Sequence, residues 1–441
     1  MNKIKEEFVG LMLAVIAFVL NLPFIPKIRV VLWDAAIYLM NAKWFAGNQI
    51  FFEVLRAPLW PLILSVFYRI GITNQAFFFV FSAIVSAISV YLTYKLATEL
   101  FGIKTGIASA IALLVIPLHF YWSPLIYTEI PASVLVLLSV LAMWNGLKDE
   151  KFQYLSILLA SLAFLTRYPV APLIPALFLF LFLQKRLSAK KFLIMSAIAA
   201  LPVVLWLGYN QLNFGFALQT FAEGLEWGSA PEPLHYYFAA LPIAINVILL
   251  LTVPGLICAL KAAKEKRVQL LIIPLILFFV VSCILSHKEP RYLLPLLPVF
   301  LIASLSFMEK LRWRHILAIL VPLAVITLCF SLKETSIFLE DNSCAGIIAA
   351  SQDVSGETLS TYWPQTSYYG NVNASSFPQN ELRFGRWLIE RNISFVVTSN
   401  KGGWPDYAKN PSFFENKPYL AEYKTVNDSC QGFRVYKVIK A

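Results

Sequence analysis

Charged residues are scarce in this chain of 441 residues. Asp, Glu, Lys and Arg together make up only 14% of it, whereas soluble domains average about one quarter. Hydrophobic residues account for 59%, and the mean hydropathy is +0.69. A globular core of this size has no room for so much apolar surface, so the composition excludes a soluble enzyme, a nucleic-acid-binding domain and a disordered scaffold. It predicts a polytopic membrane protein.

Cysteines and common catalytic motifs are also few. Five cysteines are too few for a disulfide framework, and no pair of them has metal-ligand spacing. Cys258, Cys283 and Cys329 lie in apolar runs and are predicted to be packing residues. Cys344 and Cys430 lie in the polar C-terminal part and would form one disulfide if that part is outside the cytosol. The chain has no P-loop, dinucleotide fingerprint or nucleophile elbow.

Acidic residues are fewer than basic ones, which gives a net charge of +11. From Lys333 onwards the chain has 11 basic and 11 acidic residues, whereas the apolar part before it has 25 basic and 14 acidic residues. Basic residues between apolar spans set the orientation of a membrane protein. The excess is therefore attributed to membrane topology, and no nucleic-acid partner is expected.

Eleven apolar segments approach the roughly 20 residues that a membrane-crossing helix needs. Lys3 and Lys5 precede the first segment, which we interpret as an uncleaved anchor because no small-residue cleavage site follows it. If the N-terminus is cytosolic, every basic loop cluster falls on one side, as the positive-inside rule requires, and the C-terminal part lies outside. The segments are 8–26, 75–97, 103–120, 130–147, 152–167, 168–184, 191–209, 237–261, 268–286, 291–309 and 315–332.

The predicted fold is an all-α polytopic membrane bundle of about 11 transmembrane helices, formed by residues 1–332. Its first external loop, about 27–74, is long and contains a short helix from Asp34 to Phe45. Residues 57–72 are apolar but too few to cross, and a crossing there would move the later basic loops to the other side. A re-entrant or interfacial helix is therefore expected over 57–72.

Residues 333–441 have ordinary polarity and predict a small extracytoplasmic α/β domain. The pattern indicates a helix over 381–391 and strands over 393–398 and 433–438. Asn392, between the helix and the first strand, suits a tight turn.

Two acidic residues stand at the outer ends of predicted helices. Asp34 precedes the short helix of the first loop, where Asp is a favoured N-cap, but Ile37 occupies the position at which a capping box has Glu or Gln. Glu129 opens a span beside Pro131, where an acid also complements the helix dipole. Ionisable groups near a membrane boundary are costly unless they are paired or functional. Each acid is therefore also a candidate catalytic residue.

Basic residues accompany these acids on the predicted outer side. Arg56 follows Glu53 closely, which fits either a local ion pair worth at most about 1 kcal/mol or a guanidinium that binds phosphate. Residues 287–292, His-Lys-Glu-Pro-Arg-Tyr, join two spans with almost no loop. They place two cations on the side where the positive-inside rule disfavours them, so we expect a binding site rather than only a charged helix cap. The residues of this segment expected to bind substrate are His287, Lys288, Glu289 and Arg291.

A carboxylate beside fixed cations at the outer membrane boundary matches one type of reaction. A sugar transferred from a lipid phosphate leaves a phosphate anion behind, so this leaving group needs charge stabilisation rather than the general acid of a glycosidase. Arg56, Lys288 and Arg291 would supply that charge. One carboxylate acting as a base on the acceptor hydroxyl is enough for a single inverting displacement.

The order of these parts resembles the GT-C superfamily of polyprenyl-phosphate-sugar-dependent glycosyltransferases, and within it the protein mannosyltransferase and aminoarabinose transferase branch. The resemblance covers the spans of residues 1–332. Residues 287–292 are similar to the His-Lys-Glu-x-Arg-Phe motif of endoplasmic-reticulum mannosyltransferases that use dolichyl-phosphate-mannose. The other matching motifs are Asp34, Glu53-x-x-Arg56-x-Pro58, Tyr127-Thr128-Glu129-Ile130-Pro131 and Leu165-Thr166-Arg167-Tyr168-Pro169.

The resemblance implies a role for each matching residue. It makes Asp34 the base for the acceptor hydroxyl and Glu129 a second acid that orients or assists. Arg56 stands where the aminoarabinose branch has a Lys for the lipid phosphate. The chain departs from the pattern in having Glu129 where Asp is common and Tyr292 for Phe, and it lacks the β-trefoil insertion of eukaryotic protein mannosyltransferases.

The leading hypothesis is an integral membrane inverting glycosyltransferase. It would transfer mannose or a similar hexose from a polyprenyl or dolichyl phosphate to a lipid, glycan or protein acceptor outside the cytosol. A transporter or flippase of lipid-linked sugar is the alternative, although it should have ionisable groups near the midplane and often repeated halves. A non-catalytic partner of a glycosylation complex is a third reading.

The sequence does not decide which cofactor the protein uses or which residues contact the acceptor. The chain has no metal signature, but carboxylates suit Mg²⁺ or Mn²⁺, so a divalent cation at Asp34 and Glu129 is an alternative. Glu223, Glu226 and Trp227 are candidate acceptor contacts, and an ordinary exposed loop is the simpler interpretation of them.

Overall fold

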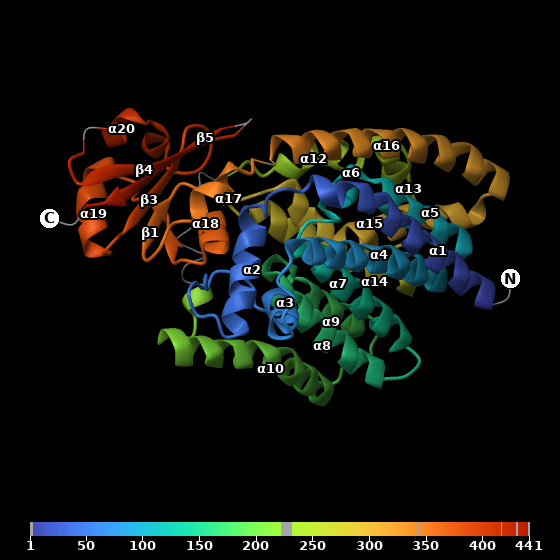
Figure 1. Ribbon diagram of the computed structural model, residues 1–441. Helices are drawn as coiled ribbons and strands as arrows, with labels where there is room; N and C mark the ends of the chain where they lie inside the picture. Colours follow the sequence, from blue (N-terminus) through green and yellow to red (C-terminus); the bar gives the residue numbers. More distant parts are fainter. Residues whose placement is uncertain (1–2, 222–231, 343, 416, 429–430, 440–441) are drawn as a thin grey trace. The chain divides into compact units, whose positions relative to one another are not determined.

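The computed structural model describes residues 3–221, 232–342, 344–415, 417–428 and 431–439 (Figure 1). The chain forms two compact units. The first comprises Met1–Ile25, Val54–Trp60 and Phe78–Ser336, and the second comprises Pro26–Glu53, Pro61–Phe77 and Ile337–Ala441. The second unit therefore contains most of the predicted first loop in addition to the C-terminal residues.

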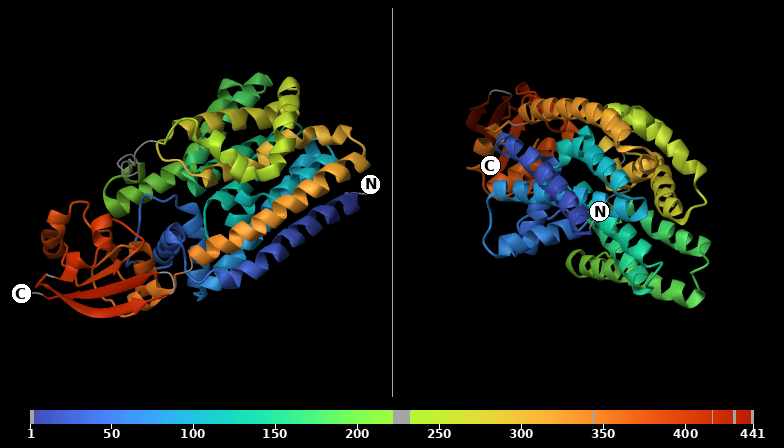
Figure 2. Two further views of the ribbon diagram at one scale, coloured as in Figure 1. Left: turned by 90° about the horizontal axis from the view of Figure 1, so that it is seen from above. Right: turned by 90° about the vertical axis from the view of Figure 1, so that its right-hand side faces the viewer.

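Seven helical segments among the described residues are long and apolar enough to cross a membrane. In the left view of Figure 2, the N-terminal helix (dark blue) and the last long helix (orange) run in nearly the same direction. These helices confirm the predicted all-α membrane bundle. The seven segments are α1 (Lys3–Asn21) with η1 (Leu22–Lys27), α4 (Gln75–Leu100), α10 (Ala189–Phe214), α12 (Tyr236–Ile245) with η3 (Asn246–Ile248) and α13 (Leu249–Lys261), α14 (Lys266–Ile284), η4 (Pro290–Leu296) with α15 (Leu297–Leu305) and η5 (Ser306–Lys310), and α16 (Trp313–Asp341).

The other four predicted spans form shorter helices. Prolines account for two of the interruptions: the backbone of Ile116 is extended immediately before Pro117, and Pro169 and Pro172 separate two helices. The expected crossing length is thus reached by seven of the eleven segments. The shorter helices are α5 (Ile103–Val115) with α6 (Pro117–Trp122), α7 (Glu129–Asn145), α8 (Lys151–Thr166), and η2 (Tyr168–Val170) with α9 (Leu173–Leu183).

Hydrogen bonds and ion pairs made by polar side chains join the loops that were predicted to be cytosolic. Lys95 of α4 pairs with Glu7 of α1, and Nζ of Lys104 donates to the carbonyl of Leu311 at 2.8 Å. These loops therefore lie at one end of the first unit, as a consistent membrane topology requires. Similar contacts join Arg267 to Leu100, Gln184 to Gln269 and Lys191 to Glu150.

A five-stranded sheet of order β2-β1-β3-β5-β4 forms the centre of the second unit. Strand β1 is parallel to β2 and β3, whereas β5 is antiparallel to β3 and β4. Phe395 and Val397 pack in one apolar cluster and Val396 in another, which is the alternation that a strand imposes. The strands are β1 (Thr358–Ser360), β2 (Ala374–Ser375), β3 (Phe395–Ser399), β4 (Leu420–Asn427) and β5 (Gly432–Val438).

Helices pack on both faces of this sheet. The first cluster includes Ile347, and the second includes Phe384 and Phe414. This arrangement confirms the predicted α/β character of the C-terminal part. The helices are α17 (Gly346–Ser351), α18 (Trp363–Gly370), η6 (Glu381–Arg383), α19 (Phe384–Glu390), η7 (Asp406–Lys409) and α20 (Ser412–Glu415).

Several local predictions are confirmed. The helix over 381–391 is η6 followed by α19, and the two predicted strands are β3 and β5. Asn392 has φ +51°, the left-handed conformation that Asn tolerates better than most residues. The two short helices of the first loop are α2 (Trp33–Phe45) and α3 (Leu59–Arg69).

The structure agrees with only some of the predictions for the cysteines. Cys344 is disulfide-bonded, and Cys430 lies outside the described residues. Cys258, Cys283 and Cys329 are free. The predicted packing role is wrong for Cys258 and Cys329, which are exposed; an apolar side chain on the outside of a membrane bundle contacts lipid rather than protein.

Candidate active site

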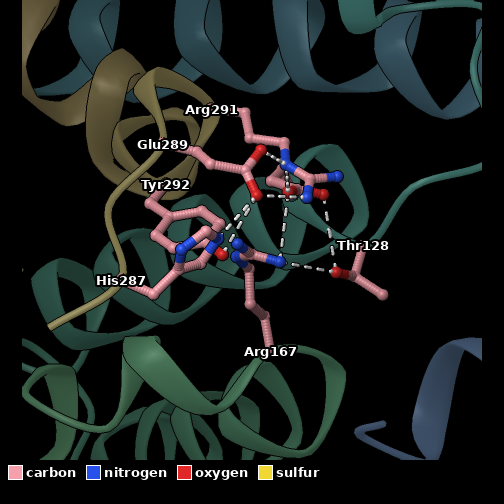
Figure 3. Close-up of polar contacts among 7 residues, drawn as sticks. Thr128, Arg167, His287, Glu289, Arg291 and Tyr292 are labelled. Carbon is pink, nitrogen blue, oxygen red and sulfur yellow. Dashed lines mark hydrogen bonds and ion pairs between the residues drawn. The ribbon is translucent and has the colours of Figure 1, made fainter. Parts of the chain in front are cut away.

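A buried carboxylate paired with two guanidinium groups lies in the first unit. Glu129 is fully buried, and its Oε1 is 3.1 Å from Nη1 of Arg167 and 3.4 Å from Nε of Arg291. Nη1 of Arg167 also donates to the hydroxyl of Thr128 at 3.1 Å. Figure 3 shows Arg167 directed towards Thr128, and Arg291 beside Glu289. A buried ion pair of this kind holds its members in fixed positions, because separating them leaves a charge without a partner in a site away from water.

Helix ends place these three residues. Glu129 is the first residue of α7, with Pro131 in its first turn, which is the arrangement expected of a helix N-terminus. Arg167 follows the last residue of α8 and has an extended backbone, since Pro169 prevents the helix from continuing. Arg291 follows Pro290, which begins η4. The dipole of α7 adds to the stabilisation of the carboxylate at its N-terminus.

Residues 287–292 form a second carboxylate–guanidinium pair next to the first. Glu289 Oε2 is 2.6 Å from Nε of Arg291, and its Oε1 accepts from Nη2 of Arg291 at 2.8 Å. His287 Nε2 and the hydroxyl of Tyr292 also reach Glu289 Oε1, at 3.0 and 3.3 Å (Figure 3). The hydrogen bond from Nη2 and the ion-pair contact of Nε to the same carboxylate hold the guanidinium in place. Arg291 therefore bridges Glu129 and Glu289.

Lys288 points to a different partner. It is buried, and its Nζ donates to the backbone carbonyl of Glu232 at 2.7 Å. The backbone N–H of Glu232 in turn donates to the carbonyl of Ser286 at 3.0 Å. The lysine thus ties residues 286–288 to the residues that precede α12.

Aromatic rings surround the guanidinium groups. The centre of the Arg291 guanidinium is 4.8 Å from the ring of Tyr127 and 5.2 Å from that of Trp122. The Arg167 guanidinium is 4.5 Å from the ring of Tyr292. Such rings stabilise a cation while excluding water. Arg167, Lys288 and Arg291 together outnumber Glu129 and Glu289, so the cluster keeps a positive charge that attracts anions.

A cavity of about 580 Å³ opens beside Arg291. Its polar lining includes Glu289 and Arg291, whereas Leu118, Ile243 and Phe330 give it apolar walls. The walls come from α6, α12, η4 and α16 of the first unit. The volume lies within the range of roughly 300–1,000 Å³ typical of ligand pockets. An amphipathic ligand with an anionic group fits this combination.

Asp34 lies in the second unit. It stands in the first turn of α2, and the N-cap of that helix is Leu32, so Asp34 does not take the N-cap position that sequence alone suggested. Asp34 is only 8% exposed. The next turns of α2 pack on α18, where Nζ of Lys43 donates to the carbonyl of Tyr368 at 3.2 Å. Burial lowers the pKa of Lys43 to about 8.

Glu53 and Arg56 stand on either side of a unit boundary. The backbone of Glu53 exchanges two hydrogen bonds with the side chain of Asn41, at 2.8 and 2.9 Å, which fixes the end of the loop after α2. Arg56 belongs to the first unit and is half-buried. The residues that line the cavity beside Arg291 do not include it.

Two protein-family models match parts of this chain. Residues 55–209 match the model of the dolichyl-phosphate-mannose-protein mannosyltransferases, and residues 220–348 match that of the Alg9-like mannosyltransferase family. The fold is similar to that of ArnT from Cupriavidus metallidurans, solved with bound undecaprenyl phosphate, with a TM-score of 0.75 over 96% of this chain and 97% of that one, at 14% identity. Together these matches support a GT-C type membrane glycosyltransferase.

Two related proteins match parts of this chain. A protein of Aquifex aeolicus (strain VF5) is 26% identical over 300 residues, which is 63% of this chain and 58% of the relative. The Dol-P-Man:Man(7)GlcNAc(2)-PP-Dol alpha-1,6-mannosyltransferase of Drosophila melanogaster is 33% identical over 89 residues, 20% of this chain and 12% of the enzyme. The chain thus spans little more than half of the first relative and a small part of the second.

One residue of the buried cluster was not predicted from the sequence. Arg167 was noted as part of a motif but received no role, although its Nη1 pairs with Glu129 Oε1. Its position between two apolar runs, immediately before Tyr-Pro, was the available signal. Glu223, Glu226 and Trp227 lie outside the described residues.

His119 has a local structural role in the first unit. His119 is buried, and its Nε2 is 3.0 Å from the hydroxyl of Ser89. Among the described residues, no group of three His, Cys, Asp or Glu side chains is placed to hold a metal ion. The pairing of Glu129 with two guanidinium groups favours an ion-pair role over cation binding for this carboxylate.

Proposed function

We propose that this protein is an inverting membrane glycosyltransferase that transfers mannose or a similar hexose from a polyprenyl phosphate to an acceptor hydroxyl outside the cytosol. The observation that carries the proposal is the cavity beside Arg291. It combines a buried guanidinium with apolar walls, which are the two properties that a lipid phosphate requires of its site.

The charge of the cluster suits the leaving group. When the sugar leaves, the bridging oxygen of the donor becomes a phosphate monoester oxygen and gains negative charge. Arg291 is held by Glu289 and Glu129, so its guanidinium is oriented before the donor binds and needs no rearrangement during the reaction. Lys288 and Arg56 add positive charge on the same unit.

Asp34 is the proposed base. Its carboxylate would take the proton of the acceptor hydroxyl as the acceptor oxygen attacks the anomeric carbon. The bond between that carbon and the phosphate oxygen breaks at the same time, and the polyprenyl phosphate leaves as an anion. A single displacement of this kind inverts the anomeric configuration.

Glu129 and Glu289 are proposed as positioning residues. Neither needs to contact the sugar, because each acts by holding guanidinium groups in place. His287 contacts Glu289 and would keep that carboxylate in position. The acceptor is a lipid, a glycan or a protein.

The comparisons support this donor class. The ArnT structure holds undecaprenyl phosphate, and the family matched by residues 55–209 is named for dolichyl-phosphate-mannose. The Drosophila relative is named as a Dol-P-Man-dependent enzyme. We propose that the N-terminus is cytosolic and that the cluster of Glu129 and Arg291 faces outwards, since the ends of the helices with many basic residues lie together at the other end of the unit.

Transfer in proteoliposomes tests the function. Labelled dolichyl-phosphate-mannose, and then a panel of other polyprenyl-phosphate hexoses, is supplied to wild type and to Asp34→Asn with membrane lipids, glycans and proteins as acceptors. The proposal expects donor consumption and a labelled product with wild type, and a large loss with Asp34→Asn. Equal turnover by the two proteins would remove Asp34 as the base. No turnover with any donor of the panel would favour a flippase or a non-catalytic partner.

A further inference from the structure

Helix α16 contributes polar side chains to the cavity that contains Arg291. Ser331, Glu334 and Thr335 all line it. The hydroxyl of Ser331 donates to the carbonyl of Val115 at 2.7 Å and is thereby satisfied within the protein. Figure 1 shows α16 beside α6 and α12, the helices that supply other walls.

Thr335 and Glu334 differ from Ser331, because the part of the chain that the structure describes gives them no such partner. Thr335 is 1% exposed, and its hydroxyl makes no hydrogen bond with any residue that the structure describes. Glu334 is half-buried, and within the described ranges it forms neither an ion pair nor a hydrogen bond. A buried hydroxyl without a partner destabilises the protein unless a ligand supplies one. An acid near a membrane boundary likewise points to a functional site.

The position of Glu334 along α16 places it at the level of the candidate site. The helix begins at Trp313, close to Leu311, which accepts from Lys104 among the loops predicted to be cytosolic. At 1.5 Å per residue, Glu334 lies about 31 Å further along the helix. That distance matches the hydrocarbon thickness of about 30 Å. Glu334 therefore reaches the opposite boundary, where Arg291 lines the same cavity.

We infer that Glu334 and Thr335 form the part of the cavity that binds the hydroxyl groups of the donor sugar. This inference rests on the proposed function. The anomeric carbon of the donor is bonded directly to a phosphate oxygen, so a phosphate bound at Arg291 holds the sugar ring within the same cavity. A carboxylate accepts hydrogen bonds from two neighbouring hydroxyl groups of a sugar, and a threonine hydroxyl both donates and accepts.

Binding of two ligands that differ only in the sugar tests the inference. Affinities for dolichyl-phosphate-mannose and for dolichyl phosphate are measured on the full chain in detergent, for wild type, Glu334→Gln and Thr335→Val. Wild type should bind the mannosylated lipid more tightly than the bare phosphate. Glu334→Gln should lower affinity for the mannosylated lipid about 10- to 100-fold, and Thr335→Val by a few-fold to about tenfold. Affinity for the bare phosphate should change less than about twofold.

Thr327→Val is the matched control. Thr327 is also buried on α16, but its hydroxyl donates to the carbonyl of Leu323 at 2.7 Å. This variant should bind both lipids as wild type does. Thr335→Val should fold at least as stably as wild type, because it removes a hydroxyl that has no hydrogen-bond partner among the described residues.

The outcomes separate this inference from the proposed function. The inference would be overturned if Glu334→Gln and Thr335→Val both bound the mannosylated lipid as tightly as wild type does, even in an active transferase. Equal weakening of both lipids would overturn it too, because the residues would then serve the phosphate or the fold. Selective loss of the mannosylated lipid in a protein that transfers no sugar would support the sugar site and contradict the transferase.

Discussion

The buried pair of Glu129 with Arg167 and Arg291 gives a sharp prediction for Glu129→Gln. The substitution keeps the shape of the side chain but removes its charge. The side chains of Arg167 and Arg291 are 10% and 9% exposed, so water cannot replace the lost partner. Removing one member of a buried ion pair costs about 3–5 kcal/mol. At about 2–4 °C per kcal/mol for a domain of roughly this size, the melting temperature should fall by roughly 6–20 °C.

Thermal unfolding of the detergent-purified protein measures this change. Glu265→Gln is the matched control, because Glu265 pairs with Arg267 at 2.7 Å but both side chains are more than 40% exposed. An exposed pair contributes about 0–1 kcal/mol, so this variant should unfold close to wild type.

A double-mutant cycle separates pairing from other effects of Glu129→Gln. Arg167→Met in the Glu129→Gln background should cost less than it does in wild type, because the arginine no longer has its carboxylate partner. Glu129→Gln with the stability of Glu265→Gln, or costs that simply add in the double variant, would refute the reasoning.

Four further predictions concern other parts of the chain. Arg291→Lys replaces two nitrogen contacts with Glu289 by at most one and should raise KM for the lipid-linked donor about 10- to 100-fold in a transfer assay. An unchanged KM would contradict phosphate binding at Arg291. Asp34→Asn should lower kcat by about 10²- to 10⁴-fold with little change in the unfolding temperature. Burial lowers the pKa of Lys43 from its ordinary 10.5 to about 8. Between these pH values the unfolded chain binds more protons than the folded one, so the free energy of unfolding should rise with pH. Unfolding measured against pH should show no such rise in Lys43→Met. Asn392→Ala should destabilise the sheet-containing unit by about 1–2 kcal/mol more than Asn392→Gly does in denaturant unfolding, because Asn392 has a positive φ that glycine adopts without strain.

Much of the fold followed from apolar run lengths and turn residues. The positions of the long helices, α2, α3, β3 and β5 were all predictable, because each rests on a local pattern of hydrophobicity. The lengths of α5 and α6 were not, since a run that is apolar throughout hides the interruption at Pro117. The association of residues 26–53 with the C-terminal residues in one unit has no local signal in the sequence, because it depends on packing between distant segments.

Several residues of the buried cluster around Arg291 were candidates from the sequence, but Arg167 and the pairing of the side chains were not predicted. Residues 287–292 stood out because their cations violate the usual charge distribution of membrane loops. Arg167 lies 39 residues from Thr128, to which it donates, and no periodicity links such distant positions. The sequence does not single out Glu334 and Thr335, because one acid and one hydroxyl near the end of a long apolar helix are typical of the polar end of a span.

A cryo-electron microscopy structure with undecaprenyl phosphate bound tests the central claim most directly. The account predicts phosphate density within hydrogen-bond distance of the Arg291 guanidinium, and the lipid chain along the apolar wall that includes Ile243 and Phe330. Phosphate density away from Arg291, with the cavity beside it empty, would contradict the account.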